Sequence, residues 1–258
     1  MNVIDSFRLK GKVALVTGGA GLFGRQIVEA LAEAGAKAYT ASRDLVKLRL
    51  QAEQLRAQGL EVEALELDQG SEDSIRQIRA RMDADHGGVD ILVNNAVARP
   101  MRDWSSPAAD FETSLRVNAV GLFLMIREFG ERMAERGGGS ILNIGSIQGM
   151  VGPDRALYEG LDWGIPPDYF FHKGGLLQLT RYAAAILGPR GVRVNAISPG
   201  GFFNNQDPTF VKRYEARTFL GRMAGETDLK GAVVFLASDA SAYVTGANLV
   251  VDGGYTGK

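Results

Sequence analysis

The sequence predicts an α/β fold in which helices cover both faces of a doubly wound, mostly parallel sheet. Three observations carry this prediction. Short apolar runs alternate with stretches in which apolar residues recur every three or four positions, as repeated βαβ units require. A glycine cluster directly follows the first apolar run. No Pro- or Ser-rich linker and no internal repeat divides the 258 residues, so one domain spanning residues 1–258 is expected.

The first elements set the pattern for the chain. Val13–Val16 is a short apolar run typical of a buried strand. From Leu22 onward the apolar residues fall on one helical face, and Gly35 supplies a natural stop. Residues 37–41 are expected to form a second, weaker strand, after which Asp44 is placed to cap the next helix.

The later elements continue the alternation. Further strands are expected at residues 61–67, 89–93, 140–144, 192–197 and 248–251. Helices are expected at residues 45–58, 71–87, 108–117, 119–136, 169–188 and 226–237. Two remaining stretches, 147–168 and 201–219, are too long for simple connections. Because each follows the carboxyl end of a strand, where ligands bind in such sheets, both are expected on the substrate side of the protein.

Composition excludes several kinds of site and partner. The chain has no cysteine, which rules out disulfides, thiolate metal sites and cysteine nucleophiles. Its 29 basic and 30 acidic residues argue against a dedicated nucleic-acid or anionic-membrane binder. Two histidines are too few for a histidine-rich metal site, so no metal is expected. No apolar run approaches membrane-helix length and Met1–Lys12 lacks the apolar core of a signal peptide, so a cytoplasmic protein is expected.

Glycine is unusually abundant, with 33 copies, and four of them lie in one loop. Thr17–Gly24 follows the first strand and opens the first helix. Glycine lets the backbone approach a pyrophosphate, and the helix N-terminus offers free amides and a positive dipole end. This placement predicts a dinucleotide site of the Rossmann type. The loop residues expected to contact the cofactor are Gly18, Gly21, Leu22, Phe23 and Gly24.

The end of the second strand indicates which dinucleotide binds. An acidic residue there would hold the ribose hydroxyls of NAD, whereas an arginine favours the 2′-phosphate of NADP. The chain has the small, neutral Ser42 followed by Arg43, whose guanidinium is a good phosphate ligand. NADP(H) is therefore favoured, with NAD(H) possible and a merely solvated Arg43 as the alternative.

A series of short motifs follows in order along nearly the whole chain. They are Lys12–Gly19, Leu67-Asp68, Asn94-Asn95-Ala96, Asn118 within 117–121, Ser146 within 143–146, Tyr169-x-x-x-Lys173, Pro199-Gly200, 243–246 and 251–254. A single one of these motifs is weak support, but all of them in this order closely resemble the short branch of the short-chain dehydrogenase/reductase family.

That resemblance implies the roles of the site residues. Ser146 would orient the substrate oxygen, Tyr169 would act as general acid and base, and Asn118 would hold a water of the proton relay. Lys173 lies four residues after Tyr169 on the same helix face, where its ammonium favours the phenolate and lowers the pKa of the phenol. Further cofactor-binding residues by this resemblance are Asp68, Gln69, Asn95, Ala96, Pro199, Gly200 and Phe202, together with Tyr169 and Lys173. Family members are commonly tetramers, so a homo-oligomer (tetramer or dimer) is also expected.

The chain departs from the usual motifs at several positions. It carries Gly21 and Leu22 where short members have glycine at 22, a spacing that resembles the extended branch with its sugar-nucleotide enzymes. Val97 replaces the last glycine of Asn-Asn-Ala-Gly and is expected to crowd the cofactor slightly. His172 stands where the family often has serine, and we interpret it as an ordinary helix residue rather than a group that contacts ligand. Asn204 stands where many members have threonine, which leaves that contact to the cofactor carboxamide open.

The largest departure is the distance from Ser146 to Tyr169, which accommodates the extra segment Gln148–Asp168. Tyr158 is a rival for the catalytic tyrosine by its distance from the serine, but Asp162 stands where its partner lysine would have to be. The segment resembles a subgroup of short-chain reductases from bacterial surface-sugar and flagellin-modification pathways. A surface flap that packs only locally is the alternative. The polar side chains suited to recognising substrate hydroxyls are Gln148, Tyr158 and Glu159.

The sequence thus predicts an NAD(P)-dependent oxidoreductase that interconverts a hydroxyl and a carbonyl group, with a sugar-derived substrate indicated. Two alternatives stay open: an epimerase or dehydratase that uses the cofactor transiently, and a non-catalytic protein that senses a dinucleotide. The complete set of Ser146, Tyr169 and Lys173 argues against the sensor, which needs no acid or base.

Overall fold

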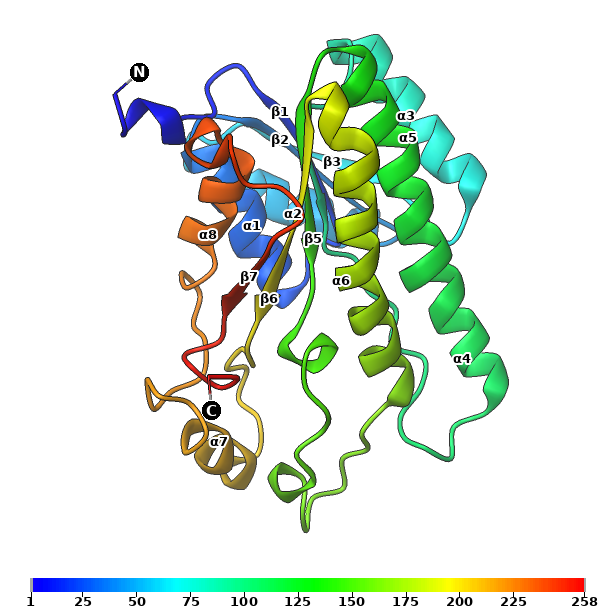
Figure 1. Cartoon of the computed structure of the whole chain (residues 1–258), viewed down its shortest axis with the longest axis vertical. Coiled ribbons are helices and arrows are strands. Elements are labelled where there is room, and N and C mark those ends of the chain that lie inside the picture. The colour runs from blue at the N-terminus through cyan, green and yellow to red at the C-terminus, as the bar shows by residue number, and fades with distance from the viewer. Residues whose placement is uncertain (1, 258) are drawn as a thin grey trace.

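The computed structural model describes residues 2–257, and a twisted parallel sheet forms its centre (Figure 1). The strands are β1 (Val13–Thr17), β2 (Lys37–Ser42), β3 (Val62–Glu66), β4 (Ile91–Asn94), β5 (Gly139–Ile144), β6 (Val192–Pro199) and β7 (Asn248–Val251). Every pair is parallel and the order is β3-β2-β1-β4-β5-β6-β7. The chain crosses over after β3, so the strand order reverses between β1 and β4. This is the doubly wound Rossmann fold in one domain that the sequence predicts.

Helices cover both faces of the sheet (Figure 1). The α-helices are α1 (Leu22–Glu33), α2 (Leu45–Arg56), α3 (Glu72–His86), α4 (Ala108–Leu115), α5 (Leu122–Glu135), α6 (Pro167–Leu187), α7 (Pro208–Glu215) and α8 (Lys230–Ala237). One buried cluster joins α3, α5 and α6 to the sheet, and a second joins α1, α2 and α8 to the opposite face. Because successive strand residues point to opposite faces, Leu15 belongs to the first cluster and Ala14 and Val16 to the second. None of the helices within residues 2–257 has both the length and the apolar character that crossing a membrane requires.

Local sequence sets the ends of these helices. The Asp44 carboxylate accepts the Lys47 N–H at 3.0 Å and so caps α2, as the sequence predicts. Ser71 caps α3 in the same way. That helix ends at Gly87, whose φ of 71° is a left-handed conformation that glycine adopts readily.

The two helices expected between 108 and 136 form one continuous rod. A π-helical turn, Arg116–Gly121, joins α4 directly to α5. The extra residue of such a turn rotates the side chains that follow it relative to an unbroken α-helix. Asn118, one of the candidate site residues, lies inside this turn.

The predicted helix at 226–237 begins only at Lys230. The Asp228 carboxylate accepts the Gly225 N–H and pairs with Arg222, and these bonds close a turn in place of the expected first helical turn. Conversely, α7 lies within 201–219, where the sequence pattern predicts no helix. The Asp207 cap marks the start of α7.

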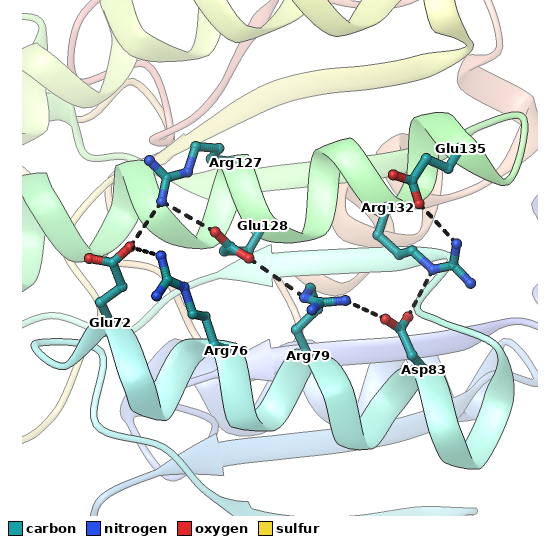
Figure 2. Close-up of polar contacts among 8 residues, drawn as sticks. All are labelled: Glu72, Arg76, Arg79, Asp83, Arg127, Glu128, Arg132 and Glu135. Atoms are coloured by element: carbon teal, nitrogen blue, oxygen red, sulfur yellow. Dashed lines mark hydrogen bonds and ion pairs between the residues drawn. The ribbon is translucent and has the colours of Figure 1, made fainter.

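An ion-pair network joins α3 to α5, two helices that cover the same face of the sheet (Figure 2). Asp83 pairs with Arg79 at 2.5 Å along α3 and with Arg132 of α5 at 3.1 Å. Arg79 also approaches Glu128 of α5 at 3.6 Å. The side chains of Asp83 and Glu128 are mostly buried, so these pairs are less screened by solvent than pairs at the fully exposed surface.

We expect Asp83→Ala to destabilise the protein by about 1 kcal/mol, because it leaves two arginines without their shared partner. Thermal unfolding at low and high salt is the measurement, and the loss should shrink at high salt. Asp85→Ala is the matched control, since Asp85 makes one exposed pair with Arg81 at 3.4 Å. Equal effects of the two substitutions would contradict a coupled network.

Candidate active site

A cavity of about 740 Å³ opens at the carboxyl ends of the strands, a size within the ~300–1,000 Å³ range of small-molecule sites. Most residues expected from the sequence line it: Gly18, Gly21, Leu22, Phe23, Gly24, Ser42, Arg43, Asp68, Gln69, Asn95, Ala96, Ser146, Tyr169, Gly200 and Phe202. Asn118, Lys173 and Pro199 do not line the cavity, and all three are buried. The topology therefore gathers segments that are far apart in the sequence at one edge of the sheet.

The β1–α1 loop lies too close to neighbouring backbone for a side chain at residues 18 and 24. Gly18 has a φ of 69°, and a Cβ at Gly24 would collide with the Gly18 carbonyl. The Asn95 Nδ2 donates to the Thr17 and Gly18 carbonyl oxygens at 3.1 and 2.9 Å, which fixes the loop against the end of β4. Gly21, the N-cap of α1, offers no side-chain cap to the first amides of that helix. The residues present therefore fit the pyrophosphate of a dinucleotide.

Two cations stand at the end of the cavity beside β2. Arg43 and Lys47 both line the cavity next to Ser42, and within residues 2–257 neither forms an ion pair. Asp44 lines it too, but its carboxylate is engaged by the Lys47 N–H. The sequence pattern does not identify Lys47, although its place in the first helical turn after Arg43 is the signal that would reveal it.

Tyr169 stands in the cavity wall in the first turn of α6, close to two positive charges. The ammonium of Lys173 lies 5.7 Å and the guanidinium of Arg99 4.7 Å from the centre of its ring. Burial raises the pKa of Tyr169, but the charges of Lys173 and Arg99 and hydrogen bonding by Ser146 outweigh it and hold the pKa below its usual value. Burial lowers the pKa of Lys173, whose Nζ donates to the Ile144 carbonyl at 2.5 Å. The phenol is thus prepared to exchange a proton nearer to neutral pH than a free tyrosine.

Arg99 is a cavity residue that the sequence pattern does not single out. It lies on the loop after β4, is exposed to the cavity, and has no carboxylate partner within residues 2–257. The one feature of the sequence that could have indicated Arg99 is its position a few residues after the carboxyl end of a strand. With Lys173 it makes this end of the cavity favourable for negative charge.

Asn118 holds the loop that carries Arg99. Its Oδ1 accepts the Ala98 N–H at 2.9 Å, and its Nδ2 donates to the Ala98 carbonyl at 2.8 Å. The side chain is buried and turned towards this loop, outside the cavity lining.

The two long segments expected on the substrate side meet over the cavity. Phe210 of α7 contacts the rings of Tyr158 and Trp163, with centres 5.6 and 4.9 Å apart. Arg217 pairs with Asp154, which ties the two segments together again. Through these contacts residues 150–166 and α7 together cover the cavity, and we call them its roof.

The polar residues singled out in the extra segment differ in where they lie. Gln148 and Tyr158 line the cavity. Glu159 does not, and instead its backbone carbonyl accepts a bond from Arg213 at 2.6 Å. Its expected part in hydroxyl recognition has no support in this geometry, because the roof contact uses the backbone and leaves the side chain outside the lining.

The remaining departures from the motifs also have definite places. Val97 lines the cavity next to Ala96. Asn204 lies outside the lining, and its N–H donates to the side chain of Gln206 at 2.8 Å. His172 is buried in α6 and does not reach the cavity.

Comparison with known proteins agrees with this arrangement. The family model described as enoyl-(acyl carrier protein) reductase matches residues 20–256. The chain is 36% identical to D-threitol dehydrogenase of Mycolicibacterium smegmatis, covering 100% of this chain and 98% of that protein. It is 35% identical to galactitol 2-dehydrogenase (L-tagatose-forming) of Cereibacter sphaeroides, covering 97% of each. A crystal structure of a gluconate 5-dehydrogenase from Burkholderia cenocepacia J2315 in complex with NADP and tartrate is similar with a TM-score of 0.90 and 31% identity, covering 100% of both chains.

The family match, the full-length relatives and the ordered motifs around one cavity lead to the same assignment. The chain belongs to the short-chain dehydrogenase/reductase family and is an NAD(P)-dependent oxidoreductase acting on CH–OH groups.

Proposed function

We propose that the protein is an NADP(H)-dependent dehydrogenase that interconverts a secondary hydroxyl and a ketone on a polyhydroxylated, sugar-derived substrate. The observation that carries the proposal is the position of Tyr169 close to Lys173, Arg99 and Ser146, at one end of a cavity whose other end carries Arg43. The cavity thus joins a cationic end suited to a phosphate with an end suited to proton transfer.

The mechanism assigns the proton to Tyr169. In alcohol oxidation its phenolate takes the hydroxyl proton of the substrate, and in ketone reduction its phenol returns the proton. Ser146 donates a hydrogen bond to the substrate oxygen, Lys173 stabilises the phenolate, and Asn118 supports the proton relay. The bound dinucleotide supplies or accepts the hydride. The glycine loop, Asp68, Gln69, Asn95, Ala96, Pro199, Gly200 and Phe202 are the residues proposed to hold it.

The chemistry of the cavity favours a polar substrate. Arg99 offers beside the reacting phenol a guanidinium that has no carboxylate partner within residues 2–257, which suits a carboxylate or hydroxyl next to the carbinol. Gln148 and Tyr158 of the roof add hydrogen-bonding groups. The relatives named above act on threitol, galactitol and gluconate. A role in surface-sugar or flagellin modification remains a narrower form of this proposal, supported by the likeness of the extra segment alone.

A substrate panel tests the function. Threitol, galactitol and gluconate with NADP⁺ are compared with a steroid and a simple ketone with NADPH, and cofactor absorbance is followed. Net cofactor reduction with polyhydroxylated compounds is expected. Conversion of a substrate with no net change in cofactor would favour the epimerase or dehydratase alternative, and turnover of steroids alone would contradict a sugar-derived substrate.

The cofactor preference is tested at Arg43. Arg43→Ala is expected to weaken NADP binding about tenfold and leave NAD binding unchanged, because a charge-assisted bond to the 2′-phosphate is lost. Fluorescence titration with each dinucleotide measures both affinities. Arg49→Ala is the control, since Arg49 is exposed on α2, the helix that follows Arg43, and does not line the cavity. Equal losses for NADP and NAD, or none, would overturn the preference for NADP.

The protein is further proposed to act as a homodimer or homotetramer. Phe171, Tyr182 and Ile186 are exposed along α6, and Phe123 is exposed on the neighbouring α5. A stripe of large apolar side chains on two adjacent helices is typical of a surface covered by another subunit. Sedimentation velocity measures the oligomeric state.

A further inference from the structure

A buried polar cluster lies behind Tyr169, where α6 packs against α4 and the π-helical turn. Its members are Ser114 of α4, Asn118 of the π-helical turn and His172 of α6, each no more than 5% exposed. The His172 Nδ1 lies 3.5 Å from the Ser114 Oγ and 3.3 Å from the Asn118 Nδ2. None of the three lines the cavity.

The direction of the hydrogen bonds can be followed by counting protons. The two Asn118 amide protons have acceptors in the Ala98 carbonyl, at 2.8 Å, and in the Ser114 Oγ, at 3.0 Å. The Ser114 hydroxyl proton then has one acceptor within reach in residues 2–257, the His172 Nδ1. A ring nitrogen that accepts a bond carries no proton, so the proton of a neutral His172 lies on Nε2, a buried atom with no hydrogen-bond partner within residues 2–257.

This chain of hydrogen bonds connects the loop that carries Arg99 to His172 of α6, and both lie beside Tyr169. At one end Asn118 clamps Ala98, the residue before Arg99, through both its backbone groups. At the other end His172 lies three residues after Tyr169, and the two rings meet edge to face with centres 5.2 Å apart. The position of Arg99 over the tyrosine ring is therefore coupled to α6 through the imidazole.

We propose that His172 is a positioning residue. As a neutral Nε2–H imidazole it accepts, through Nδ1, the last hydrogen bond of this buried chain, and it thereby holds the Arg99 loop at a fixed distance from Tyr169. A serine at this helix position is too short to reach both Ser114 and the tyrosine ring. The coupling is thus a feature of this chain's own residues, and it deepens the proposed function, on which its kinetic consequences rest.

The charge state of the imidazole agrees with this role. Burial, followed by the positive charges of Lys173 and Arg99, lowers the pKa of His172 to about 3, against a small opposing effect of the Asp168 carbonyl. The other ionisable groups around the cluster are Tyr169 and the buried carboxyl of Asp168, one helical turn before His172. His172 therefore stays neutral wherever Tyr169 exchanges its proton.

Nitrogen NMR tests the tautomer without reference to activity. The full chain with ¹⁵N-labelled histidine gives signals from two residues only, and a His86→Gln variant assigns them. The His172 signals are expected to show the neutral Nε2–H form, unchanged across neutral pH. A protonated Nδ1 or a charged ring would overturn the proposal. Ser114→Ala removes the donor to Nδ1 and is expected to mix the two tautomers.

Kinetics test the positioning itself. His172→Asn keeps an acceptor near the place of Nδ1 and should retain most of the activity, whereas His172→Leu should lower kcat roughly tenfold, because small displacements of reacting groups are costly. The pH profile of His172→Leu should also move to higher pH as Arg99 drifts from Tyr169, with the KM for NADP unchanged. A folded His172→Leu variant, checked by thermal unfolding, that keeps the wild-type kcat and pH profile would refute the role. Failure of the proposed function itself would appear elsewhere, as full activity of Tyr169→Phe.

Discussion

Tyr169→Phe is expected to lower kcat by about 10²–10⁴-fold, the contribution typical of a positioned general acid or base. The substitution keeps the ring next to Arg99 and Lys173 and removes only the phenolic oxygen. Shape and burial of the site should therefore persist, and the dinucleotide should bind as it does to the wild-type protein. Initial rates on a substrate from the panel, with fluorescence titration of NADPH, separate the loss of chemistry from a loss of binding.

Tyr182→Phe is the matched control for this prediction. It makes the same change on the same helix, outside the cavity, and keeps the ring that the proposed subunit contact would use. Its activity should equal that of the wild type. Undiminished turnover in Tyr169→Phe would show that the proton takes another route, and equal losses in both variants would point to a general weakness of α6.

Elements and site residues that depend on local pattern are those the sequence predicts best. Leu92 and Val93 lie in a strand covered on both faces, so an unbroken apolar run marks β4. Gly18 directly follows β1 and Ser146 comes two residues after β5, and parallel strands bring their carboxyl ends to one edge. Their meeting in one cavity is therefore a consequence of topology, which the βαβ alternation already implies.

Features that depend on contacts between distant segments cannot be predicted from the local sequence. α7 forms where Phe210 packs on Tyr158 and Trp163 of the other long segment, and no local signal announces those contacts. Arg99 resembles any loop arginine until the loop is folded over Tyr169. His172 shows the same limit, because its sequence position says nothing of the buried donors that surround it.

Arg99→Leu is expected to raise the KM for an anionic substrate by about 10–100-fold, the loss of one charge-assisted hydrogen bond. Leucine keeps much of the side-chain volume and removes the charge that lies over the Tyr169 ring. A neutral polyol such as threitol should lose far less, because it offers no carboxylate to the guanidinium. Comparison of gluconate with threitol therefore isolates the electrostatic part of substrate binding.

The same substitution has a second consequence, whose sign is fixed by the Tyr169 environment. Burial raises the pKa of Tyr169, and Lys173 and Arg99 lower it, so removing Arg99 must raise it. The phenolate that oxidation requires then forms only at higher pH, and the rising limb of kcat for alcohol oxidation moves upward. Reduction needs the phenol, so its falling limb moves upward as well.

Arg102→Leu is the control for both measurements, the KM for an anionic substrate and the pH dependence of kcat. Arg102 is paired with Asp162 at 2.9 Å and does not line the cavity, so its removal changes net charge equally without touching the site. If Arg99→Leu alters KM and leaves both pH limbs in place, the guanidinium serves the substrate and not the tyrosine. If the limbs move with unchanged KM, the substrate carries no anionic group at this position, and the contact proposed between Arg99 and a substrate carboxylate is wrong. Movement of both, in Arg99→Leu alone, is the result that the two positive charges around one phenol predict.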